Sequence, residues 1–369
     1  MTENEKYLFG FSLLDGVGPA RFKKIKKNFP SLKEAWQCFD LEKFLAIGID
    51  AKTVKMFLKQ KSSLDLEKIW QKQIICENLK ILDQDNPFYP LQLKELPSAP
   101  FLLFYRGNPE ILNHRQLAVV GSRRATFYGH QVLEKILPPL IGAGLTITSG
   151  LAQGIDSLAA EIALKENSPT IAVLGGGLGQ KILQNHPNFS LAQKILEKNG
   201  ILLSEYPPFQ TPNKTTFPAR NRIIAGLTLG TLVIEAGEKS GSLITANYAL
   251  ENNREVLAVP NNIFQPLSVG ANNLIKQGAK MVTGPNDVLE AFNFLPLNNL
   301  TTKSTTDIVF EDNLEKKIFE NLTLEPQYLD KIAQICQNSP AEISAKISLM
   351  EIKGLVRNIG GGRFIRGIN

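Results

Sequence analysis

The stretch LAVVGSRRATFYGHQVLEKILPPLIGAGLTITSGLAQGID, residues 117–156, decides the fold of this chain. It begins with the apolar run LAVVG (117–121), and a second run, LTITS (145–149), follows a segment that has the pattern of a helix, 130–141. Both runs are almost continuously apolar, whereas a half-exposed strand would alternate apolar and polar residues. They therefore predict strands of a parallel sheet that is covered by helices on both faces.

Further apolar runs repeat this unit along the chain. They are TIAVLG (170–175), ILLSE (201–205), TLVIEA (231–236) and EVLAVP (255–260). Helical patterns lie between runs, for example at 155–165 and 243–252. Repeated β–α units predict an α/β core, a doubly wound, Rossmann-like and mostly parallel sheet, within residues 66–294.

The N-terminal residues 1–65 predict a separate helical domain. The segment LDGVGP (14–19) precedes a basic stretch, 20–29, and a second apolar–glycine junction lies at 44–49. This arrangement resembles a helix–hairpin–helix or SAM-like element, whose glycine turn allows backbone N–H groups to approach a phosphate. The motif is short, and we favour a compact helical cap with a solvated basic face over direct DNA contact.

The remaining segments complete the domain organisation. Residues 66–110 are a lead-in to the core that is rich in proline and aromatic residues, where prolines prevent a long helix and 101–105 predicts a strand. The polar, threonine-rich segment 295–312 is interpreted as a linker. Residues 313–369 predict three short helices and two strands around a glycine turn, which is a winged-helix pattern.

Composition and charge narrow the class of protein. The 369 residues are 43% hydrophobic and 21% charged, which is typical of a soluble globular protein and excludes a disordered chain. The formal net charge of +6 permits a polyanionic partner without requiring one. Cys38, Cys76 and Cys336 lie far apart and favour a reducing compartment. No run approaches the roughly 20 apolar residues of a membrane span, so we expect a cytoplasmic protein.

Three glycine-rich turns follow the predicted strands. They are GSRRAT (121–126), SGLAQGID (149–156) and GGGLG (175–179). Free N–H groups and helix N-termini at such turns bind anions, and ligands of an open α/β sheet lie beyond the carboxyl ends of its strands. Any one turn is better explained by tight packing of strand and helix, but three on one edge favour a phosphate-binding face. The sequence has no GxGxxG fingerprint and no Gly-Lys pair, which excludes a dinucleotide fingerprint and a Walker A loop.

A later segment, 212–227, carries two arginines. Pro218 is typical of a helix start, which would place Arg220 and Arg222 in the first helical turn. Cations there oppose the helix dipole, so an anion should compensate them. We leave two explanations open, a bound phosphate or an internal ion pair with Glu205 or Glu235.

Other residues in and near this segment have simpler roles. Lys214 lies in a polar loop and is suited to a phosphate. Phe217 could stack on a base, although a hydrophobic contact at the start of the helix is the simpler role. Ser240 or Ser242 is expected to cap the helix that follows.

Seven ordered motifs together resemble the DNA-processing protein A family. They are DNPFYP (85–90), VGSRRAT (120–126), SGLAQGID (149–156), FPARNRIIAGL (217–227), VIEAGEKSGSLITA (233–246), AVP (258–260) and GANNLI (270–275). The similarity covers nearly the whole chain and is strongest over 86–292.

The resemblance implies a cytoplasmic, non-catalytic protein that binds single-stranded DNA. It implies that the protein protects incoming DNA in natural transformation, helps to load the recombinase RecA for recombination, and forms a homodimer through the Rossmann-like domain. It also implies a DNA-binding set, which is Gly121, Ser122, Arg123, Gly150, Gly154, Asp156, Lys214, Phe217, Arg220 and Asn221. Asp156 is an acid and is expected to orient an arginine or to bond a base edge rather than to hold a phosphate.

Two other classes of function stay open. One is an enzyme of the same Rossmann-like class that acts on a nucleotide or a nucleoside monophosphate, with Glu235 as its base. The histidines, His114, His130 and His186, match no catalytic motif, and no metal-ligand spacing is present. We therefore expect no catalytic residue, no cofactor and no metal. The other class is a structural scaffold whose basic face is merely solvated.

Overall fold

The computed structural model describes residues 3–38, 40–294, 310–323 and 325–367. It divides into two compact units, Met1–Leu295 and Pro296–Asn369. The predicted boundary after residue 65 lies inside the first unit and stays a prediction.

A nine-stranded sheet is the centre of the first unit. Its strands are β1 (Lys80–Asp83), β2 (Leu102–Gly107), β3 (Gln116–Val120), β4 (Thr146–Ser149), β5 (Ile171–Val173), β6 (Ile201–Ser204), β7 (Gly230–Val233), β8 (Glu255–Ala258) and β9 (Lys280–Met281). They lie in the order β1-β2-β6-β5-β4-β3-β7-β8-β9, and only the pairs β1–β2 and β2–β6 are antiparallel. The predicted doubly wound, mostly parallel sheet is confirmed.

The strand order places a topological switch point between β3 and β7. The chain runs from β3 outward through β4, β5 and β6, and then returns to the other side of β3 for β7, β8 and β9. Val120 pairs with Val233 at the carboxyl ends of these two central strands. Connections leave such neighbouring strands in opposite directions, which opens a crevice for a ligand.

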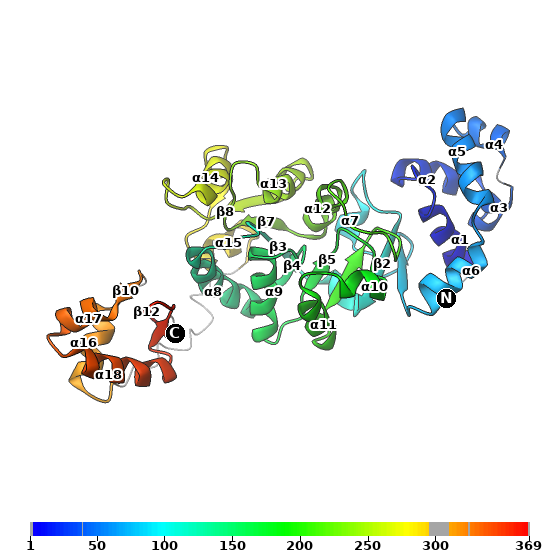
Figure 1. Ribbon diagram of the computed structural model, residues 1–369. Helices are drawn as coiled ribbons and strands as arrows, with labels where there is room; N and C mark the ends of the chain where they lie inside the picture. The colour runs from blue at the N-terminus through cyan, green and yellow to red at the C-terminus, as the bar shows by residue number, and fades with distance from the viewer. Residues whose placement is uncertain (1–2, 39, 295–309, 324, 368–369) are drawn as a thin grey trace. The chain divides into compact units, whose positions relative to one another are not determined.

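Helices cover both faces of this sheet. Figure 1 shows α12, α13 and α14 on one side and α8, α9 and α11 on the other. The helices of this part are α7 (Leu91–Lys94), α8 (Phe127–Gly142), α9 (Ile155–Lys165), α10 (Gln180–Gln184), α11 (Phe189–Glu197), α12 (Thr216–Leu227), α13 (Gly241–Glu251), α14 (Val269–Lys276) and α15 (Pro285–Ala291), with 3₁₀ turns at Pro109–Asn113 and Pro266–Ser268. Burial on both faces explains why the strand runs are almost continuously apolar.

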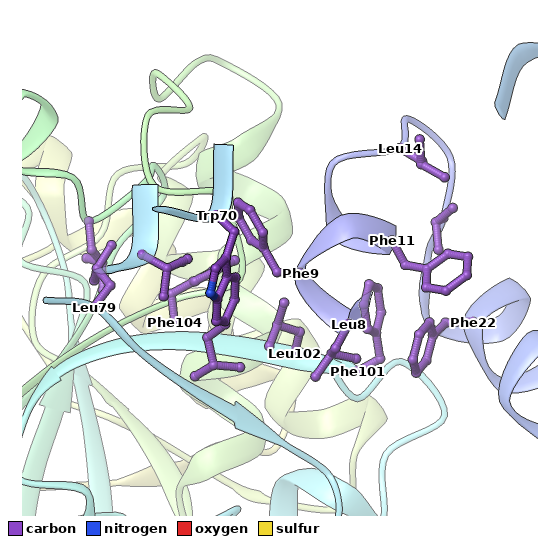
Figure 2. Close-up of a cluster of buried hydrophobic side chains, with 14 of the residues drawn as sticks. Leu8, Phe9, Phe11, Leu14, Phe22, Trp70, Leu79, Phe101, Leu102 and Phe104 are labelled. Carbon is purple, nitrogen blue, oxygen red and sulfur yellow. The ribbon is translucent and has the colours of Figure 1, made fainter. Parts of the chain in front are cut away.

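The N-terminal helices pack against the antiparallel edge of the sheet. They are α1 (Glu3–Ser12), α2 (Pro19–Asn28), α3 (Leu32–Gln37), α4 (Leu41–Ala46), α5 (Ala51–Ser62), α6 (Leu66–Trp70) and a π-helical turn, Gln71–Ile75. Figure 2 shows Phe9 near Phe104 and Phe22 near Phe101, with ring centroids 6.0 and 4.1 Å apart. Aromatic side chains therefore join these helices and β2 in one hydrophobic cluster.

The glycine turn between α1 and α2 is left-handed at Gly16. Gly16 has a φ of +84°, and its carbonyl accepts a hydrogen bond of 2.9 Å from Arg21. Lys24 likewise donates to the carbonyl of Gly48 at 2.8 Å. Two cations of the basic face thus stabilise this domain's own turns, in keeping with the structural role that we favour.

The second unit has a winged-helix arrangement. It consists of α16 (Asn313–Asn321), β10 (Gln327–Tyr328), α17 (Leu329–Cys336), α18 (Pro340–Ile352), β11 (Val356–Asn358) and β12 (Arg363–Arg366). Its strands lie in the order β10-β12-β11, and the turn between β11 and β12 contains Gly360, Gly361 and Gly362, all at positive φ. The predicted three helices and two strands are confirmed, whereas β10 was not predicted. Most of the predicted linker, 295–309, lies outside the described residues.

Candidate nucleic-acid interface

The first two glycine turns are bonded to each other at the switch point. The carbonyl of Ser122 accepts a 3.1 Å hydrogen bond from the N–H of Ile155. Gly154 has a φ of +79°, and a Cβ at this position would lie 2.3 Å from the Ser122 oxygen. Only glycine allows this backbone approach, so the second turn supports the first.

The first turn presents Arg123 to solvent. The Ser122 N–H donates to the carbonyl of Glu235 at 2.7 Å, and the Ser122 hydroxyl donates to the carbonyl of Arg124 at 3.1 Å. These bonds fix the turn, while the side chain of Arg123 stays exposed. Its guanidinium lies over the ring of Phe217, 5.3 Å from the ring centroid.

A groove of about 630 Å³ runs along this edge of the sheet. It is lined by most of the predicted DNA-binding set, namely Gly121, Ser122, Arg123, Asp156, Lys214, Phe217, Arg220 and Asn221. Gly150 and Gly154 are not among its lining residues. The structure thus brings eight of the ten predicted residues together, although their contact with DNA stays a prediction.

Lys239 also lines the groove and was missed from the sequence. It is exposed, in the segment directly after β7 and before α13. Its place at the carboxyl end of a central strand was the available signal. Within the described residues, the exposed charged side chains that line this groove are the cations Arg123, Lys214 and Lys239.

Arg220 is buried beneath the groove rather than exposed in it, since only 5% of the residue is accessible. Its guanidinium donates to the carbonyl of Gly150 at 2.9 Å and to the carbonyl of Val173. Burial lowers the pKa of Arg220 to about 10. A Cβ on Gly150 would lie 2.5 Å from this guanidinium, which explains the glycine. Arg220 therefore ties the carboxyl ends of β4 and β5 together.

Asp156 is also buried, and it bonds to the same residue, Gly150. Its carboxylate accepts a 3.0 Å hydrogen bond from the N–H of Gly150. Burial raises the pKa of Asp156, while the charge of Arg220 acts in the opposite direction. Gly150 is thus held through its N–H by the carboxylate of Asp156 and through its carbonyl by the guanidinium of Arg220, so both side chains position the turn.

The two arginines of α12 differ from the sequence expectation. The helix begins at Thr216, so Arg220 and Arg222 are its fifth and seventh residues, and placing them in the first turn was wrong. Asn213 causes the earlier start, because its Oδ1 accepts the N–H groups of Thr215 and Thr216 at 2.8 and 3.1 Å.

The internal ion pair is confirmed for Arg222. Its guanidinium bonds to Glu205, and both side chains are less than a fifth exposed. Glu235 pairs with neither arginine. It is fully buried, and its carboxylate accepts hydrogen bonds from the N–H of Thr126, at 2.9 Å, and from the hydroxyl of Thr126. Glu235 thus anchors the first turn.

The third glycine turn is a packing surface. A Cβ on Gly175 would lie 2.8 Å from the ring of Phe217, and one on Gly177 would lie 2.2 Å from the carbonyl oxygens of Pro207 and Pro208. Phe217 is therefore seated between this turn and Arg123. Ser240 caps α13 as predicted, and its hydroxyl accepts the N–H of Ser242 at 3.4 Å.

Two kinds of feature are absent from the described residues. No helix in them is both long and apolar enough to span a bilayer. They contain no group of three or more His, Cys, Asp or Glu side chains placed to hold a metal ion.

Comparisons with known proteins agree along the whole chain. The family model described as DNA recombination-mediator protein A matches residues 80–293, and the DprA winged helix domain matches 303–362. Protein Smf of Synechocystis is 34% identical over 99% of both chains. Protein Smf of Escherichia coli is 36% identical over 85% of this chain and 84% of its own.

Two solved structures are similar to this chain over part of its length. The X-ray structure of DNA processing protein A from Streptococcus pneumoniae is 35% identical and has a TM-score of 0.65, covering 77% of this chain and 97% of its own. A structure of DNA processing protein A from Helicobacter pylori is 27% identical with a TM-score of 0.52, covering 58% and 95%. Sequence motifs, sheet topology and the winged-helix unit thus lead to one conclusion: the chain belongs to the DNA recombination-mediator protein A family.

Proposed function

We propose that this protein binds single-stranded DNA along the groove at the switch point, with little sequence preference. The observation that carries the proposal is the set of exposed cations that line this groove: Arg123 and Lys239 follow β3 and β7, and Lys214 lies in the loop before α12. The relative from Helicobacter pylori, DNA processing protein A, binds single-stranded DNA. Cations on a groove lined by backbone suit a flexible phosphodiester strand and carry no code for base sequence.

We expect tighter binding of a single strand than of a duplex. A flexible strand can follow the groove between the turns, whereas a rigid duplex cannot place successive phosphates in it. Fluorescence anisotropy with a labelled oligo-dT and a duplex of equal length, at one salt concentration, checks this. Equal affinity for the two forms would contradict the proposal, and no affinity for either would favour a scaffold.

We propose that the protein acts on this DNA without catalysis and without a cofactor. The enzyme alternative needs a base in the groove, and Glu235 was its candidate. Glu235 is fully buried and accepts two hydrogen bonds from Thr126. It is therefore engaged in holding the first turn.

We further propose that the protein protects incoming DNA in natural transformation and helps to load RecA during recombination. These steps would place it in the cytoplasm, where recombinase and DNA meet. The family assignment supports this role, but it does not identify the surface that would contact RecA.

Homodimerisation through the Rossmann-like domain belongs to the same proposal. Ile263 and Phe264, in the loop after β8, are 77% and 86% exposed, and Met281 on the edge strand β9 is 51% exposed. Large exposed apolar side chains such as these favour a contact with another protein chain. We expect Phe264→Asp to shift sedimentation from dimer to monomer, while Leu250→Asp, at an exposed site on α13, leaves it unchanged. A monomeric wild type would contradict the proposal.

A further inference from the structure

A second groove, of about 680 Å³, lies between the N-terminal helices and the antiparallel edge of the sheet. One wall is the face of α2 that carries Ala20, Lys23 and Lys27. The other wall is the end of α7 with the segment ELPSAP (95–100), which leads to β2. We call this space the N-terminal groove. Within the described residues, it shares no lining residue with the groove at the switch point, so the two are separate surfaces.

The floor of the N-terminal groove is apolar. Phe22 and Phe101 are stacked with their ring centroids 4.1 Å apart, as Figure 2 shows, and Leu96 lines the groove from the other wall. Each of these three residues is less than a tenth exposed. The two rings are buried against each other, so they do not offer the exposed faces on which nucleic-acid bases stack. The floor therefore suits aliphatic side chains.

Exposed lysines stand on both walls of the N-terminal groove. Lys23 and Lys27 are one turn apart on α2, and Lys94 is the last residue of α7 on the opposite wall. Within the described part of the chain, none of the three forms an ion pair. An anionic partner that enters the groove would thus meet a cation on either side.

The cations of α2 have two different roles. Arg21 and Lys24 donate to turn carbonyls of their own domain. Lys23 and Lys27 do not take part in those bonds and line the N-terminal groove instead. Stabilisation of the helical domain therefore accounts for the first pair and leaves the second pair available to a partner.

The walls of the N-terminal groove are held in place by hydrogen bonds and an ion pair. The carbonyl of Pro100 accepts a 2.6 Å hydrogen bond from the hydroxyl of Tyr89 and a 3.2 Å hydrogen bond from Nε2 of Gln84. Lys26 pairs with Asp85, which joins α2 to the turn after β1. A groove that is already formed loses less conformational entropy when a partner binds.

Two acids in the lining favour a peptide over a nucleic acid. Asp83 and Glu95 line the groove together with the lysines. A phosphodiester strand carries a charge at every nucleotide, and some of its phosphates would lie close to these acids. A peptide can direct its carboxylates to the lysines and its backbone N–H groups to the acids, because its charges are spaced by other residues.

We propose that the N-terminal groove docks an acidic peptide segment of a partner protein. Apolar side chains of the segment lie on the floor, and its carboxylates face Lys23 and Lys27 on one wall and Lys94 on the other. Charge complementarity supports this occupant, and the apolar floor adds affinity that charge alone does not give. Because the groove is separate from the one at the switch point, the protein can hold this partner and DNA together.

The first test offers the full-length protein a synthetic acidic peptide. A labelled short peptide of alternating aspartate and leucine is titrated by fluorescence anisotropy, and a second peptide of equal charge has serine in place of each leucine. We expect the leucine peptide to bind roughly fivefold tighter or more, because its leucines are buried on the apolar floor. Equal affinities for the two peptides, or no binding of either, would overturn the proposal.

The second test locates the bound peptide. Lys23→Glu with Lys27→Glu reverses two charges on α2, and Lys94→Glu reverses one on the opposite wall. Lys55→Glu with Lys59→Glu is the matched control, because these exposed lysines are also one turn apart, on α5, and do not line the groove. We expect each groove variant to weaken the leucine peptide by roughly fivefold or more, and the control by less than about twofold. Equal losses in the control, or no loss in Lys94→Glu, would overturn the proposal.

A folding control and a DNA competitor complete the design. Thermal melting checks each variant, and Lys94→Glu tests the groove by itself if the double variant on α2 is unfolded. Oligo-dT is then titrated against the bound peptide and against the groove variants. We expect the variants to retain the oligo-dT affinity of the wild type. Displacement of the peptide by oligo-dT, together with weaker oligo-dT binding in the groove variants, would assign the groove to DNA and overturn the peptide.

Discussion

Replacing Arg220 by methionine is expected to destabilise the fold by roughly 3–5 kcal/mol, because it removes a buried charge that bonds two carbonyls and offsets the charge of Asp156. The change would leave Asp156 as an uncompensated buried acid and would free the carbonyls of Gly150 and Val173. Urea unfolding of the full chain measures the loss. Arg124→Met is the matched control, because Arg124 is exposed and should stay within about 0.5 kcal/mol of wild type.

The stability that Arg220→Met loses should depend on pH, because Asp156 titrates. Burial raises the pKa of this carboxyl in the folded state, and removing the opposing charge of Arg220 would raise it further. A raised carboxyl pKa means that the protonated form favours folding, and that this stability is lost as the pH rises through the folded-state pKa. The deficit of Arg220→Met should therefore be smaller near about pH 5 than near about pH 8. An equal loss of stability at the two pH values would show that Asp156 is not the group left uncompensated.

Arg123→Ala and Lys214→Ala are each expected to weaken single-strand binding by roughly tenfold at low salt, as for a lost hydrogen bond to a charged group. Each neutralised phosphate releases counterions, so the slope of log K against log salt should become shallower by about 0.7 per lost contact. Anisotropy titrations at several salt concentrations, with two unrelated sequences, give both quantities. Both variants should lose affinity for the two sequences equally, because phosphate contacts carry no base code.

Arg124→Ala is the control for this pair, since Arg124 is exposed in the same turn but does not line the groove. Thermal melting separates binding from stability, because Arg123 also lies over the ring of Phe217. A lower melting temperature of Arg123→Ala with an unchanged salt slope would show a structural role for Arg123 and would remove the first turn from the DNA interface.

The core strands and helices could be predicted from the sequence because local patterns specify them. The runs at 117–121 and 231–236 became β3 and β7, and the predicted helix at 155–165 was found with the same bounds. The strands β1 and β9 were not predicted, because β9 is only two residues long and β1 lies in the lead-in between helical and proline-rich segments. Short edge strands depend on a neighbouring strand more than on their own composition.

The sequence by itself determined the fold class, the family and the collection of residues at one edge of the sheet, because strand periodicity and ordered motifs are local. Only the tertiary structure decided the role of each charge. Arg220 and Arg222 are two residues apart on one helix, yet one is buried against the ends of β4 and β5 and the other pairs with Glu205. The partners of a buried charge come from strands distant in the chain, and sheet order alone places them within hydrogen-bonding reach.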